Sequence, residues 1–112
     1  MDTDAFAAAW IADWNSHDLD RILAHYAEEI VFNSPKAKII TGDGVVRGIA
    51  ALRAYWTKGL ASRPNLKFEL EETFVGHASL TLVYRAENGS RAAETVIFDD
   101  ARKVVRSTAC YR

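Results

Sequence analysis

The chain has 112 residues, of which 49% are hydrophobic, 26% charged and 11% aromatic, and its formal net charge is −1. We expect one domain over residues 1–112, because a second hydrophobic core would not fit in this length. No block of Lys or Arg marks a nucleic-acid or membrane surface, so we expect neither partner. The N-terminal "MDTDAF" does not resemble a secretory signal, and the single Cys110 allows no internal disulfide, so we expect a cytoplasmic protein.

Two helices are predicted at the start of the chain. Over residues 3–15, Phe6, Trp10 and Trp14 recur at helical spacing. Thr3 or Asp4 can cap this helix through a side-chain oxygen. After a break at residues 15–17, Asp18 favours a second helix, whose apolar stripe comprises Leu19, Ile22, Leu23, Tyr26 and Ala27.

The next segments are shorter. Residues 30–33 read as a strand that stops at Pro35, because proline cannot donate a hydrogen bond to a neighbouring strand. A hairpin-like turn is expected at residues 42–44, followed by a short strand at residues 45–47. A third helix then opens at Gly48 and ends at residues 63–65.

The last part of the chain alternates with a period of two, which is typical of half-buried strands. The expected strands are residues 66–75, 79–87, 91–98 and 104–112, with a tight hairpin turn at Asn88-Gly89. The fold class is therefore α+β: a curved antiparallel sheet wrapped as a cone around three N-terminal helices. The inner face of such a cone is core at one end and can form a pocket at the other.

Three segments carry a resemblance to a known family. "WNSHDLDRILAHYAEEIVFNSP", "VVRGIAALRAYW" and "AETVIFDDARKVVRSTACY" occur in this order and cover most of the chain. They resemble the nuclear-transport-factor-2-like superfamily, in its SnoaL-like and ketosteroid-isomerase-like branch. The resemblance implies the cone-shaped fold, a cavity for a small hydrophobic molecule and a homodimer formed through the outer sheet face. It does not fix a function, because the family includes isomerases, dehydratases, hydrolases, cyclases and non-enzymes.

Glu94 is the leading candidate for a catalytic residue. In "AETVIF" it shares a strand face with Val96 and Phe98, so an inward Phe98 implies an inward carboxyl group. Burial would raise the pKa of that carboxyl, and its protonated form could donate to a developing oxyanion. By the resemblance, Glu94 matches the donor aspartate of ketosteroid isomerase. That aspartate is a well-known example of a carboxylic acid that stays neutral and donates a hydrogen bond. The alternative is an ion pair with Arg85, Arg106 or a dimer partner.

The resemblance also suggests roles for two other positions. Trp10 matches a position where ketosteroid isomerases carry a tyrosine donor, although a ring of the core is the simpler interpretation. Ser34 matches the general base of those enzymes, an aspartate directly before a proline. Neither Ser34 nor Asn33 titrates near neutral pH, so both are expected to orient a ligand or simply to end the strand.

The histidines do not suggest a metal site, because His17, His25 and His77 lack metal-ligand spacing. Asp13 is a weak candidate for a base at the cavity mouth, and a solvated helix edge is the simpler reading. Some dehydratase relatives use a His–Asp pair, and the sequence shows no matching pair. Cys110 reads as a small buried residue.

The remaining predicted ligand contacts come from aromatic and small residues on inward faces. We expect no cofactor. Two functions stay open: a small-molecule-binding domain without catalysis, or a cofactor-independent isomerase, lyase or hydrolase that acts on a small hydrophobic carbonyl or hydroxyl compound. A filled cone with a purely structural role is a third possibility. The predicted ligand-binding residues are Trp10, Trp14, Tyr26, Asn33, Ser34, Trp56, Tyr84, Phe98, Ser107 and Tyr111.

Overall fold

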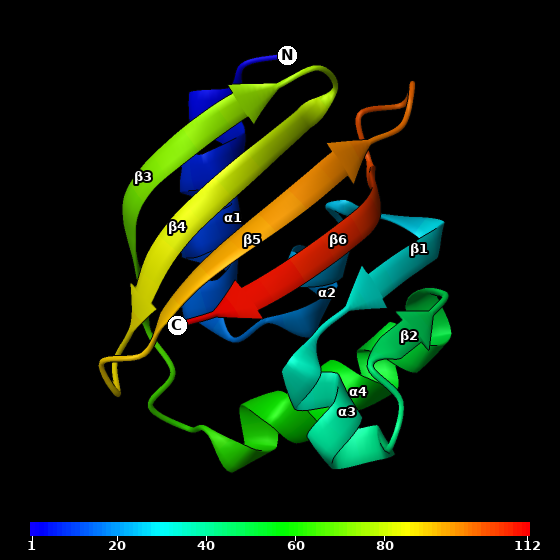
Figure 1. Ribbon diagram of the computed structural model, residues 1–112, viewed down its shortest axis with the longest axis vertical. Coiled ribbons are helices and arrows are strands. Elements are labelled where there is room, and N and C mark those ends of the chain that lie inside the picture. The colour runs from blue at the N-terminus through cyan, green and yellow to red at the C-terminus, as the bar shows by residue number, and fades with distance from the viewer.

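The computed structural model describes all 112 residues and has an α+β architecture, which confirms the predicted fold class. Helices occupy the first half of the chain and a strand meander occupies the second (Figure 1). The elements in chain order are α1 (Thr3–Ser16), α2 (Leu19–Leu23), β1 (Tyr26–Asn33), α3 (Pro35–Thr41), β2 (Val45–Arg47), α4 (Ile49–Ser62), β3 (Phe68–Gly76), β4 (Ser79–Ala86), β5 (Arg91–Phe98) and β6 (Val104–Tyr111).

All six strands belong to one curved sheet with the order β2-β1-β6-β5-β4-β3. The predicted meander of four strands is confirmed, and Gly89 adopts the positive φ of 85° that its hairpin turn needs. The expectation of a wholly antiparallel sheet is wrong at one pair, because β1 runs parallel to β6. No hairpin joins these two strands, so no turn dictates their relative direction.

The first two helices differ from the sequence expectation at their ends. The cap of α1 is Asp2, whose carboxylate accepts a hydrogen bond from the Ala5 N–H at 3.0 Å, rather than Thr3 or Asp4. Asp18 caps α2 as predicted, but the helix ends at Leu23. Tyr26 and Ala27 therefore lie on β1, and not on a helical stripe.

The helix α3 was not predicted, because the sequence analysis placed only a hairpin-like turn and a short strand after Pro35. Ser34 caps it by accepting a hydrogen bond from the Lys36 N–H at 3.2 Å, and Pro35 occupies its first turn. Gly42 ends the helix with a φ of 83°, a left-handed conformation that favours glycine. The chain thus carries four helices rather than three.

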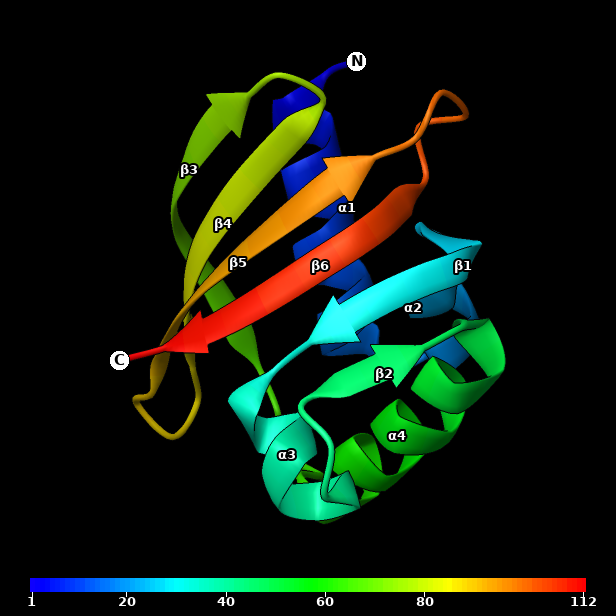
Figure 2. The same cartoon turned by 45° about the vertical axis from the view of Figure 1, so that its right-hand side comes forward.

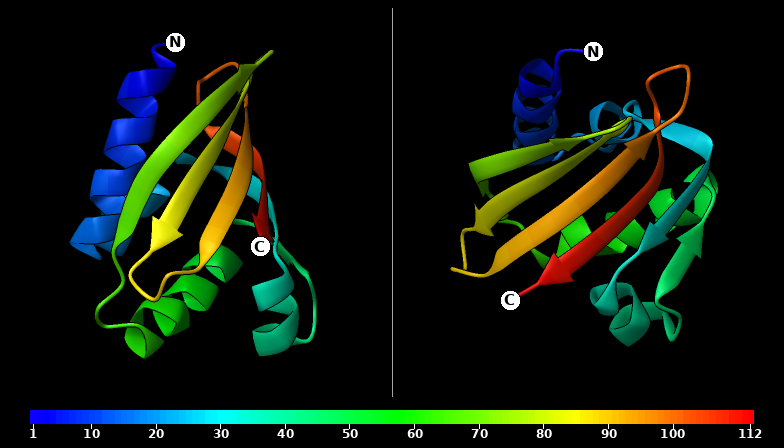
Figure 3. Two further views of the ribbon diagram at one scale, coloured as in Figure 1. Left: turned by 60° about the vertical axis from the view of Figure 1, so that its left-hand side comes forward. Right: turned by 45° about the horizontal axis from the view of Figure 1, so that its top comes forward.

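The helices lie on the concave side of the sheet (Figure 3). Their inward residues and those of the strands form one hydrophobic cluster, which includes Trp10, Leu52 and Val96. The side-chain amide of Asn15 fixes the start of β3, since it accepts from the Phe68 N–H at 2.7 Å and donates to the Phe68 carbonyl at 2.9 Å. None of the helices is long and apolar enough to cross a membrane.

Candidate functional site

A pocket lies between one end of the curved sheet and the helices α3 and α4. These two helices are at the bottom of the view in Figure 2. Its volume is about 130 Å³. A cavity of about 150 Å³ lined by apolar side chains is large enough to hold benzene, so the enclosed part of this pocket suits a single ring. The lining residues are Trp14, Phe32, Lys36, Ile40, Tyr55, Trp56, Gly59, Leu60, Ser62, Arg63, Leu66, Phe68, Tyr84, Glu94 and Tyr111.

Glu94 lies at the inner end of this pocket, on the concave face of β5. It is 4% exposed and sits between Leu82 of β4 and Ala109 of β6. Its carboxyl oxygens accept hydrogen bonds from the Tyr84 hydroxyl at 3.0 Å and from the Ser107 hydroxyl at 2.9 Å. The inward placement that the strand alternation predicted is therefore present, and the alternative of an ion pair within the chain is absent.

The pKa of the Glu94 carboxyl group is set mainly by its burial, because no cation lies beside it. Desolvation raises the pKa of Glu94 above its ordinary value, and the hydrogen bonds from Ser107 and Tyr84 only partly oppose that effect. The result is a carboxyl group that favours its protonated form more than an exposed glutamate does. A protonated carboxyl can donate one hydrogen bond to an oxygen atom inside the pocket.

Three tyrosines surround this carboxyl and the pocket. Burial, followed by the negative charge of Glu94, raises the pKa of Tyr84 well above its ordinary value and that of Tyr111 to about 12. Burial likewise raises the pKa of Tyr55. All three phenols are therefore neutral hydroxyl groups near neutral pH and can serve only as hydrogen-bonding groups.

Ser34 and Asn33 occupy different surroundings. Ser34 is 1% exposed and its hydroxyl accepts the α3 cap bond, close enough to the Tyr55 and Tyr111 phenols to lower their pKa slightly against the larger effect of burial. It stands just behind the lining residues. Asn33 is exposed at the end of β1 and does not line the pocket.

Trp10 and Tyr26 lie behind the pocket wall, which differs from the prediction that they contact a ligand directly. The indole N–H of Trp10 donates to the Tyr26 hydroxyl at 2.9 Å, so this donor is already used inside the core. Trp14 does line the pocket, and its buried indole N–H has no hydrogen-bond partner within the protein. The inner wall is thus aromatic, with one unused donor directly behind its surface.

The other predicted ligand-binding residues also divide into those that line the pocket and those that do not. Trp56, Tyr84 and Tyr111 line the pocket. Ser107 holds Glu94 without lining the pocket itself, and Phe98 packs against Phe6 at the far end of β5 with ring centroids 4.9 Å apart. The structure therefore brings together the aromatic residues and Glu94, but not Phe98.

The structure contains a His–Asp pair that the sequence did not reveal. His25 Nε2 lies 2.7 Å from an Asp13 carboxylate oxygen, and the Arg21 Nε lies 3.2 Å from the other oxygen. This corrects both the reading of Asp13 as a solvated helix edge and the statement that no such pair exists. Neither residue lines the pocket, so the pair does not face Glu94 across it.

Sequence reasoning also missed the polar residues at the pocket mouth, Lys36 and Arg63. Lys36 comes from α3, which was not predicted, and Arg63 follows the last turn of α4. Cys110 is exposed on the outer face of β6, which corrects its reading as a buried residue. No group of three or more His, Cys, Asp or Glu side chains gathers in an arrangement that could hold a metal ion.

Comparison with known proteins places these features in a family. The chain resembles a SnoaL-like protein of unknown function from Burkholderia thailandensis, with 39% identity, a TM-score of 0.94, and coverage of 97% of this chain and 92% of that one. It shares its fold with the epoxide hydrolase/cyclase-like enzyme SalBIII of pyran ring formation in salinomycin, at 18% identity, a TM-score of 0.77, and 97% and 89% coverage. It also shares the fold of TerC co-crystallised with polyporic acid, at 13% identity, a TM-score of 0.78, and 95% and 88% coverage.

No curated protein matches the sequence. The family model described as the SnoaL-like domain matches residues 7–112, almost the whole chain. This match agrees with the curved six-stranded sheet and the helices packed against it. The chain therefore belongs to the SnoaL-like domain family.

Proposed function

We propose that this protein binds a small, mostly apolar organic molecule that carries a carbonyl or hydroxyl oxygen. The observation that carries the proposal is the buried carboxyl group of Glu94 at the inner end of a pocket with ten hydrophobic residues among its fifteen lining residues. Aromatic walls supply affinity for a ring, and one convergent polar group at the end supplies orientation. The co-crystal of TerC with polyporic acid supports such a use of this fold.

The volume of the pocket limits the size of the ligand that it can enclose. Its volume of about 130 Å³ is too small to enclose a steroid, so the expected ligand has about one ring inside the protein. Part of a larger molecule can extend through the mouth, where Ile40 and Leu60 are partly exposed.

The test uses 4′-methylacetophenone as an uncharged one-ring probe. In a ¹H–¹⁵N spectrum we expect the indole N–H signals of Trp14 and Trp56 to shift on titration, and that of Trp10 to move much less, because only the first two line the pocket. Single Trp→Phe variants assign the three signals.

A pocket-filling variant provides the control. Gly59 lines the pocket on α4, and a Cβ added there meets no atom within 4 Å. Gly59→Leu should therefore abolish the shifts without loss of stability, since leucine also favours a helix by roughly 1 kcal/mol over glycine. Ala54→Leu, on the exposed side of the same helix, should leave them intact. Absence of shifts with this probe, or shifts that survive Gly59→Leu, would contradict the proposal.

The second candidate function is acid–base catalysis in the same pocket. It is favoured by the raised pKa of Glu94 and by the two hydroxyl groups that hold its carboxyl in place. The protonated carboxyl would give its proton to the oxygen of a ketone while a solvent water takes a proton from the adjacent carbon, and the enol forms as an isomerase or lyase step requires. Return of the proton from that water to the Glu94 carboxylate would restore the acid. The likeness in fold to an epoxide hydrolase/cyclase-like enzyme supports this candidate.

Hydrogen–deuterium exchange separates the two functions. A catalyst should accelerate exchange of the acetyl protons of 4′-methylacetophenone in D₂O, and Glu94→Gln should remove the acceleration while the probe still binds. Exchange at the rate of the buffer alone, together with probe binding, would reject the catalytic function and retain the binding function.

A further inference from the structure

The mouth of the pocket carries two cationic side chains from different elements. Lys36 projects from α3 and its Nζ lies 4.0 Å from the centre of the Tyr111 ring. Arg63, after the end of α4, holds an ion pair with Glu87 at 2.7 Å. Lys36 itself makes no ion pair. Two cations and one carboxylate leave the mouth with an excess of positive charge.

The charge of Lys36 is poorly compensated within the protein. Burial and the neighbouring Arg63 lower the pKa of Lys36, and Glu87 offsets only part of that effect. The contact with the Tyr111 ring is a cation–π interaction, which is weak compared with a counter-ion. An anionic oxygen placed at the mouth would relieve the repulsion between Lys36 and Arg63.

The buried carboxyl group does not serve as that counter-ion. Glu94 makes no ion pair with Lys36 or Arg63. Its carboxyl oxygens accept hydrogen bonds from the Tyr84 and Ser107 hydroxyl groups instead. The pocket therefore has two independent polar ends, one cationic at the mouth and one carboxyl at the inner end, joined by an apolar wall.

We propose that the ligand is an organic acid, with an anionic oxygen facing Lys36 and Arg63 at the mouth and a neutral carbonyl or hydroxyl oxygen directed at Glu94. This inference rests on the proposed binding function and names its ligand class. The body between the two oxygens is a ring that packs against Trp14, Trp56 and Phe68. A ligand that ends in a cation is disfavoured by the same two side chains.

The test compares matched probes that differ in one charge. 4-Acetylbenzoate has an acetyl oxygen at one end of a single ring and a carboxylate at the other, and its methyl ester keeps the shape without the charge. We expect 4-acetylbenzoate to bind about three- to fivefold more tightly than the ester, the range of a partly exposed ion pair. The preference should shrink as salt is added, because salt screens exposed charges.

Two lysine variants on the same helix locate the effect. Lys36→Gln should remove the preference for the acid, so that the acid and the ester bind this variant with equal affinity. Lys38→Gln is the matched control, since Lys38 is exposed on α3 and does not line the pocket. It should leave both affinities as they are in the native protein.

The outcomes separate the two proposals. If the ester binds as tightly as the acid, or if Lys36→Gln leaves the preference intact, the organic-acid inference is wrong and the binding function stands. If neither compound nor 4′-methylacetophenone perturbs Trp14 and Trp56, the binding function itself is wrong and the inference falls with it.

Discussion

The carboxyl group of Glu94 is buried beside two hydroxyl groups and no cation, and this has a consequence for stability. Because its folded-state pKa is raised, the protonated form stabilises the folded protein below the unfolded-state pKa of about 4.3, and that contribution is lost as pH rises through the folded pKa. Glu94→Gln cannot ionise. The stability of the native protein should therefore fall relative to this variant between pH 4 and pH 8, by about 1.4 kcal/mol for each unit of pKa increase.

Urea denaturation of both proteins at several pH values measures this difference. Glu69→Gln, on an exposed part of β3, is the matched control and should follow the native protein. Parallel stability curves for the native protein and Glu94→Gln would show that Glu94 titrates as an exposed glutamate does.

Single residues also show which side-chain positions a sequence pattern can predict and which it cannot. The inward direction of Glu94 follows from the alternation of β5, because strand geometry fixes it locally. The pairing of Asp13 with His25 does not, because these residues lie on α1 and in the turn before β1 and meet only after the helices pack. Similarly, only the assembled core reveals that the Trp10 indole donates to Tyr26 instead of to a ligand.

At the scale of elements, α3 carries Lys36 into the pocket mouth and depends on its cap. Ser34→Ala removes the side-chain acceptor of the Lys36 N–H and should destabilise the protein by about 1 kcal/mol. Amide hydrogen exchange over residues 35–41 should accelerate more than exchange elsewhere. Ser90→Ala is the control, because the Ser90 hydroxyl makes no hydrogen bond within the protein, and equal effects of the two variants would contradict the capping role.

The sequence did contain a signal for α3, although Pro35 was interpreted only as the end of a strand. Serine is a preferred N-cap residue, and proline is favoured at the first position of a helix. Glycine, here Gly42, is favoured directly after the last turn of a helix. The early end of α2 had no comparable signal, because the apolar spacing of Leu19, Ile22 and Leu23 continues through Tyr26. The strand β1 overrides that spacing, since its pairing with β6 and β2 buries Ile30 and Phe32.

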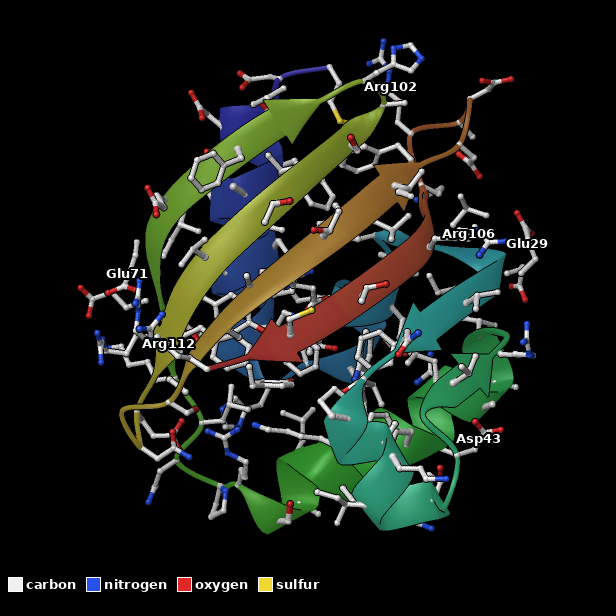
Figure 4. The ribbon with its side chains drawn as sticks, viewed as in Figure 1. Glu29, Asp43, Glu71, Arg102, Arg106 and Arg112 are labelled. Atoms are coloured by element: carbon white, nitrogen blue, oxygen red, sulfur yellow. The ribbon has the colours of Figure 1, made fainter.

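At the scale of the whole molecule, we propose that two copies associate through the outer sheet face. No helix covers this face (Figure 1), and its uncharged side chains include the exposed Phe74 and Ile97 and the half-buried Thr95. Charged side chains such as Glu71, Arg106 and Arg112 lie toward its margins (Figure 4). An uncharged centre with a charged rim is the usual composition of a protein interface.

Sedimentation or light scattering of Thr95→Arg tests this association. A charge at the centre of the face should convert a dimer to chains of 12.5 kDa, whereas Thr57→Arg on the exposed side of α4 should not. A native protein that is already monomeric at high concentration would contradict the proposal.

The parallel pairing of β1 with β6 also bears on how the chain folds. Tyr26 pairs with Val104 and Phe32 pairs with Ser107, so these contacts close loops of most of the chain length. The hairpins of β3, β4 and β5 need only neighbouring segments and can form early. Because distant pairings slow folding, β1 and the short β2 beside it can join the sheet only after residues 104–111 have been synthesised. Of the paired strands, β1 and β6 are separated by the longest interval during translation.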